Sequence, residues 1–127
     1  MRRTINDYVC PKCFNRIENC ICEVQPWNLI MVDVNMQEII RTLNGKGYKT
    51  TSCCESHFGD TLNLYISFVC DYGITTPDGF NWKNRDNCII YSFKKADVSS
   101  EEKYNNLKSE KLETLRKWAE SLPSIKR

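Results

Sequence analysis

The chain has 127 residues, 27% of them charged and 41% hydrophobic, and its formal net charge is +2. These values predict a single globular domain, residues 1–127, and exclude a membrane-spanning helix, because no apolar run is long enough. The first residues lack the apolar segment of a secretory signal, which predicts a cytoplasmic protein. Within residues 1–60, and again within residues 61–98, basic side chains are as numerous as acidic ones. The charge distribution therefore gives no support to nucleic-acid binding.

The eight cysteines are the most unusual feature of the composition. An even count would suit a secreted disulfide scaffold, but such scaffolds are usually smaller and lack a core of this kind. In a reducing compartment, clustered cysteines bind metal or take part in chemistry. We therefore favour metal binding over disulfides.

Four of these cysteines form a compact motif near the N-terminus, with the spacing C-x2-C, six residues, then C-x-C. Four thiolates in so short a segment can surround one tetrahedral zinc ion, and an all-cysteine shell is typical of structural sites. We predict one structural zinc per chain, in an arm of residues 1–26 attached to a core of residues 27–127. The predicted metal ligands are Cys10, Cys13, Cys20 and Cys22.

The first helix is predicted to begin after Asn35, a suitable N-cap, and to end at Gly45 or Gly47. Its apolar residues recur at the spacing of one helical face, which predicts that this face is buried. They are Met36, Ile39, Ile40 and Leu43.

Strands are predicted at 48–52, 62–70 and 88–93, and a short apolar run at 29–32 could add another. The clearest is 62–70, where apolar side chains alternate with polar ones and so define a core face. Between the last two strands, residues 71–86 form a long connection with a Pro-Asp-Gly turn, of the kind that often serves as a binding loop.

The last predicted element is an amphipathic helix from about Ser99 to Ser121, with Ser99 and Glu102 as a capping-box pair and Pro123 after its end. Its apolar stripe predicts that it covers the sheet. The order of elements indicates an α+β fold: a small antiparallel sheet of three to four strands covered by two helices, with an N-terminal four-cysteine zinc knuckle.

A second group of thiols follows the strand at 48–52, where Cys53 and Cys54 are adjacent and His57, the only histidine, stands in the same predicted loop. One interpretation is a thiol nucleophile activated by the imidazole. Another is a second metal site. In the third, which we favour, the thiols are buried small hydrophobes and His57 is a hydrogen-bonding residue of the loop, or the segment is a non-catalytic ligand-binding loop. The nucleophile is disfavoured because no Asn or Asp is evidently placed to orient the imidazole. The remaining thiols, Cys70 and Cys88, are expected in the core.

These patterns predict a zinc-stapled binding protein, not an enzyme, that recognises a protein or a small polar ligand through the 53–60 and 71–86 loops. Its size would also fit a phage-type inhibitor. The alternatives are a small enzyme that uses Cys53 or Cys54 with His57, and a zinc-knuckle nucleic-acid module. No membrane contact is expected. The predicted ligand-binding residues are Cys53, Cys54, Ser56, His57, Trp82, Lys83 and Arg85.

The combination of C-P-x-C, C-x-C and the segment from Leu43 to His57, L-N-x-K-G-Y-x-T-x-x-C-C-x-x-H, resembles small uncharacterised cysteine-rich proteins of low-GC bacteria and their phages. The resemblance covers about the first 60 residues. It implies no activity that can be carried over to individual residues.

Overall fold

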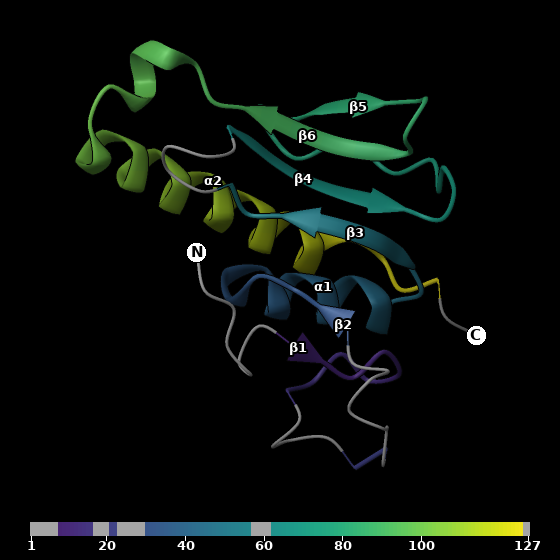
Figure 1. The fold of residues 1–127 in the computed structure, drawn as a ribbon. Helices are drawn as coiled ribbons and strands as arrows, with labels where there is room; N and C mark the ends of the chain where they lie inside the picture. Colours follow the sequence, from purple (N-terminus) through teal and green to yellow (C-terminus); the bar gives the residue numbers. More distant parts are fainter. Residues whose placement is uncertain (1–7, 17–20, 23–29, 57–61, 126–127) are drawn as a thin grey trace.

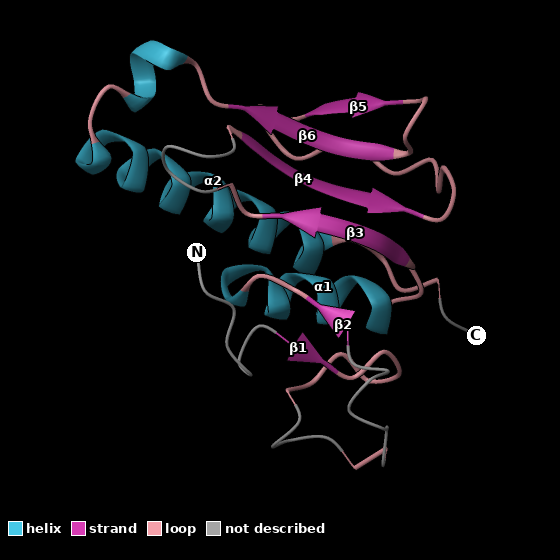
Figure 2. Ribbon diagram, viewed as in Figure 1, coloured by secondary structure: helices cyan, strands magenta, loops and turns pink. Residues whose placement is uncertain are grey.

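A computed structural model of the chain describes residues 8–16, 21–22, 30–56 and 62–125. A four-stranded antiparallel sheet forms one layer, and two α-helices cover one of its faces (Figures 1 and 2). This arrangement confirms the predicted α+β fold. The elements are β1 (Tyr8–Val9), β2 (Ile30–Met31), η4 (Val34–Met36), α1 (Gln37–Gly45), β3 (Thr50–Cys54), β4 (Asn63–Phe68), β5 (Asn81–Lys83), β6 (Cys88–Ser92), η5 (Lys95–Val98) and α2 (Glu101–Ser121).

The strands of the sheet are in the order β3-β4-β6-β5. Because β6 returns between β4 and β5, the connection at 71–80 must pass to the outer edge of the sheet before β5 begins. The three-residue strand β5 was missed, since Trp82 is its only apolar residue and gives no alternation. The other two strands, β1 and β2, pair with each other apart from this sheet.

Alternation along β4 separates a core face from an uncovered face. Leu64, Ile66 and Phe68 are buried, as their period of two predicts. Tyr65 and Ser67 point to the opposite face, which neither helix covers. Each residue of β4 therefore fixes the side on which its partners in β3 and β6 lie.

The first helix is preceded by η4, a 3₁₀ turn, and its predicted N-cap does not form. Asn35 lies within η4, and its side-chain amide donates a 2.6 Å hydrogen bond to Glu55. The C-terminal end agrees with the prediction: Gly47 has φ +100°, and the N–H of Tyr48 donates to the carbonyl of Leu43 at 3.0 Å. This is a Schellman cap, which needs glycine at the left-handed position.

The second helix matches its predicted span, but its cap is one residue later. Ser100, not Ser99, is the N-cap, and its hydroxyl accepts a 3.2 Å hydrogen bond from the N–H of Lys103. Within the described residues, no helix is long and apolar enough to cross a membrane.

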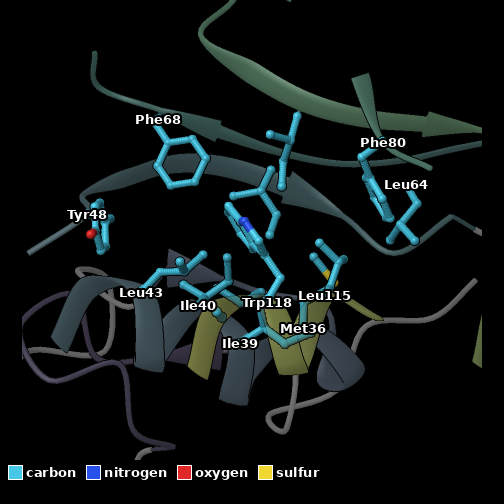
Figure 3. Packing of buried hydrophobic residues seen from close by; sticks show 14 of the residues in the cluster. Met36, Ile39, Ile40, Leu43, Tyr48, Leu64, Phe68, Phe80, Leu115 and Trp118 are labelled. Carbon is cyan, nitrogen blue, oxygen red and sulfur yellow. The ribbon is translucent and has the colours of Figure 1, made fainter. Parts of the chain in front are cut away.

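The core lies between the sheet and the helices. Figure 3 shows the apolar stripe of α1 and two residues of α2, Leu115 and Trp118, facing side chains of the sheet. Tyr48, in the turn before β3, closes one end of the core with an exposure of only 1%. The predicted stripe of α1 is fully buried, and it consists of Met36, Ile39, Ile40 and Leu43.

The connection at 71–80 closes the edge of the core and is not a free loop. Pro77 and Phe80 are buried. The indole N–H of Trp118 donates a 2.8 Å hydrogen bond to the carbonyl of Thr75, which ties the connection to α2. The ring of Tyr72 packs edge-on against Tyr48, with 5.5 Å between ring centroids. This part of the predicted binding loop therefore has a packing role.

Candidate functional site

The N-terminal cysteines are positioned by a tight turn that follows β1. Cys10 is completely buried, its N–H donates to the carbonyl of Asn15 at 3.0 Å, and its carbonyl accepts from the N–H of Phe14 at 2.9 Å. Phe14 has φ +59°, which lets the chain reverse directly after Cys13. The N–H of Lys12 points at the sulfur of Cys10 at 3.3 Å. Such N–H groups favour a charged thiolate.

This turn brings Cys10 and Cys13 close to Cys22, and the three sulfur atoms lie within 4.8 Å of one another. Around a tetrahedral zinc ion with Zn–S bonds of about 2.3 Å, sulfurs are about 3.8 Å apart. The cluster therefore has nearly the spacing that one metal ion requires. The fourth predicted ligand, Cys20, lies outside the described residues.

The second group of thiols is arranged differently from the prediction. Cys53 and Cys54 are strand residues of β3, not loop residues. Cys53 pairs with Ile66 on the core side, whereas Cys54 pairs with Tyr65 on the uncovered side. Because neighbouring residues of a strand point to opposite faces, the two thiols cannot form one site. His57, the expected partner of these thiols, lies outside the described residues.

The surroundings of Cys53 disfavour its thiolate. Burial raises the pKa of Cys53 to about 12, and the negative charges of Asp33, Cys54 and Glu55 act in the same direction. A hydrogen bond from the backbone of Asp33 lowers it only in part. At neutral pH this thiol is therefore protonated and a poor nucleophile.

The expectation that Cys70 and Cys88 are buried was wrong for the first and is confirmed for the second. Cys70 is exposed, because β4 ends at Phe68 and the chain turns away. Cys88 is buried, but it pairs with Ser67 and so stands on the face away from the core. Burial raises the pKa of the Cys88 thiol.

A buried polar network at the end of β3 was not predicted. The carboxylate of Glu55 pairs with the ammonium of Lys108 at 3.2 Å, and the N–H of Glu55 donates to Asp33 at 3.0 Å. Ser56 has φ +70° and is completely buried. Its hydroxyl accepts a 3.0 Å hydrogen bond from Tyr104, and its carbonyl accepts one from Lys108 at 2.9 Å.

This network holds the end of β3 against α2. Every polar contact named for it satisfies a group that is largely withdrawn from water, which is the usual requirement for burial. Ser56, a predicted ligand-binding residue, has a hydroxyl with zero exposure and so serves packing in this structure. The only sign of this network in the sequence was an acidic residue, Glu55, beside the cysteines. Nothing in the sequence indicated that Lys108 of α2 is the cation that pairs with it.

The three remaining predicted residues divide between the core and the surface. Trp82 lies on the core side of β5, with its ring 6.3 Å from that of Phe68. Among the described residues, its indole nitrogen is the only buried side-chain N or O atom without a hydrogen-bond partner. Lys83 and Arg85 are exposed where β5 turns into β6.

The uncovered face of the sheet contains a shallow hollow of about 400 Å³. Its lining is mainly polar, and the described residues of this lining combine hydroxyl groups with one cation and one anion. Ser52 and Tyr65 contribute hydroxyls from β3 and β4, and the charges come from Lys83 and Asp86 at the β5–β6 turn. Cys88 forms part of its floor. We call this region the open sheet face.

No protein-family model, curated protein or solved structure matches this chain. The residues described above are therefore the basis on which a function is assigned.

Proposed function

We propose that this protein is a zinc-stapled binding protein and not an enzyme. The observation that carries the proposal is the convergence of the sulfurs of Cys10, Cys13 and Cys22 within 4.8 Å. With Cys20 as the fourth ligand, the shell would be closed, and such a zinc ion would have no position for water or substrate. Its role would be to hold the N-terminal arm, with one zinc per chain.

The state of the other thiols supports a non-enzymatic role. Catalysis by cysteine needs a thiolate near neutral pH and a base that faces it. Burial instead raises the pKa of Cys53 to about 12, and Cys54 lies on the other face of the sheet.

The recognition surface that we propose is the open sheet face together with the β5–β6 turn. Two of the predicted ligand-binding residues, Cys54 and Lys83, lie on this side of the sheet, and a third, Arg85, is exposed in the turn. Hydroxyls beside a single cation and a single anion favour a small polar ligand or a polar protein surface over an apolar one.

Cobalt substitution tests the metal site. Co²⁺ bound by four thiolates gives intense sulfur-to-metal charge-transfer bands and the visible bands of a tetrahedral ion. We expect both in the wild type and in Cys70→Ser, whose thiol is exposed and outside the cluster. Cys13→Ser should lose sulfur-to-metal intensity and bind the ion more weakly. A spectrum without thiolate bands in the wild type would refute the zinc site.

Chemical-shift mapping with a library of small polar fragments tests the recognition surface. We expect the shifts to cluster on β4 and β6 and to disappear in Ser67→Tyr, which fills the hollow. Ser99→Tyr, at an exposed site away from the sheet, is the matched control. Shifts confined to another surface would refute the open sheet face as the recognition site while leaving the zinc site intact.

A further inference from the structure

We propose that a second surface, a groove between the cysteine turn and the end of α1, binds single-stranded nucleic acid. The groove has a volume of about 620 Å³. One wall is the turn at 11–14, the floor is the last part of α1, and the other wall is the start of β3. We call it the knuckle groove. In Figure 1, β1 and the turn that follows it, coloured purple, lie beneath α1.

Among the described residues, three cations line the knuckle groove, one from each of these segments: Lys12, Arg41 and Lys49. No carboxylate is among the described residues that line it. In the described part of the chain, these three side chains form no ion pair, whereas Lys108 is paired with Glu55. Like charges gathered at one groove repel one another, and a bound polyanion would remove that cost.

The negative charge of the proposed zinc site and of the end of α1 does not cancel this charge. A zinc ion with four thiolates has a formal charge of −2, against +3 from the groove cations, which leaves +1. The C-terminal end of α1 is partly negative, but its last carbonyls accept hydrogen bonds from the N–H groups of Lys46, Gly47 and Tyr48. The zinc would depend on the proposed metal site, so the metal content is measured separately in the test below.

The apolar parts of the groove favour a nucleic acid over a bare phosphate. The half-buried ring of Phe14 stands beside Lys12 in the same wall, and Val69 is 51% exposed on the opposite side. A cationic groove with an aromatic side chain is the usual way to bind a single strand, whose unpaired bases can stack. A duplex hides its bases and would use only the cations.

Gly45 gives a way to change the charge of the groove without altering its walls. It lies in the last turn of α1 and lines the floor, and a Cβ added there would meet no atom within 4 Å. Gly45→Gln and Gly45→Glu have side chains of the same size and differ in one negative charge. Both residues also favour a helix more than glycine does.

The experiment is fluorescence anisotropy of the zinc-loaded protein with 5′-labelled U12 RNA and dT12 DNA between 50 and 200 mM salt. We expect both oligonucleotides to bind. The logarithm of the association constant should fall with log[salt] with a slope of about −2, because three phosphates are neutralised and each contributes about −0.7. Lys49→Gln should make this slope less steep by about 0.7, because one phosphate contact is lost. Gly45→Glu should bind roughly tenfold more weakly than Gly45→Gln, with zinc content unchanged in both. A preference for U12 over dT12 would identify RNA as the ligand.

Three results would overturn the inference. The first is no binding of either oligonucleotide at 50 mM salt. The second is equal affinity of Gly45→Gln and Gly45→Glu, which would place the nucleic acid elsewhere. The third is binding of inorganic polyphosphate as tightly as of U12 at equal charge, which would show that the bases contribute nothing. Failure of the zinc site would be recognised independently as loss of the metal from the wild type.

Discussion

Glu55 at the end of β3 and Lys108 in the middle of α2 form an ion pair with 3.2 Å between Oε2 and Nζ, and their side chains are only 9% and 15% exposed. A pair so withdrawn from water fixes one arrangement of the strand end on the helix, because either charge alone would be costly to bury.

Lys108→Met should therefore lower the free energy of unfolding markedly. Removal of one member of a buried pair costs about 3–5 kcal/mol, and we expect about 3 kcal/mol because Asn35 still donates to Glu55. Urea unfolding measures the change. The control is Lys117→Met, whose side chain is 71% exposed and 4.0 Å from Glu113. A loss for Lys108→Met no larger than that of the control would contradict the account.

Lys46 should stabilise a helix to which it does not belong. No basic residue stands in the last turn of α2. The ammonium of Lys46, at the end of α1, instead donates to the carbonyls of Ala119, Glu120 and Leu122 at 2.9, 2.5 and 2.7 Å. Lys46→Met should cost about 2 kcal/mol and speed amide exchange in the last turn of α2. Unchanged exchange there, relative to the exposed Lys103→Met, would show that the contact contributes nothing.

The thiol of Cys53 should be inert at neutral pH. Because burial raises its pKa to about 12, we expect iodoacetamide at pH 8 to modify the exposed Cys70 quickly and Cys53 only when the protein unfolds. Peptide mass spectrometry after timed quenching distinguishes the two. Alkylation of Cys53 as fast as that of Cys70 would instead favour the alternative in which Cys53 is a catalytic nucleophile.

The same raised pKa predicts a pH dependence of stability. An ordinary thiol titrates near 9.0, so the unfolded chain loses this proton first, and between pH 9 and 12 the folded chain binds more protons. Stability must then fall as pH rises through this window, by up to about 1.4 kcal/mol per pH unit for this thiol. Cys53→Val should show a smaller decline over the same window. Identical pH profiles would mean that the raised pKa is wrong.

Elements with a strong period could be predicted from the sequence. The stripes of α1 and α2 and the alternation of β4 each depend on side chains within one segment, so a local pattern was sufficient. The position of Cys53 was harder to predict. A register shift between Thr50 and Ser52 changes the phase of β3, and the strand continues through both cysteines.

The polar network and the knuckle groove depend on residues far apart in the chain. In the sequence, Glu55 has the character of a surface residue, and only the fold places Lys108 beside it. Counts of charge along the sequence likewise cannot show that Lys12, Arg41 and Lys49 line one groove. The three clustered thiols were predictable for the opposite reason, since they are close in sequence and their spacing is itself the signal.

The most direct test of the central claim is native mass spectrometry of the purified protein, followed by amide exchange before and after chelation of the metal. We predict one zinc per chain in the wild type and in Cys70→Ser, and less than one per chain in Cys13→Ser. Chelation should accelerate exchange at residues 8–16 and leave the amides of β4 and β6 protected, because their core does not depend on the metal. A wild-type chain that binds no zinc would contradict the zinc-stapled fold, and loss of protection throughout the sheet on chelation would show that the metal holds far more than the arm.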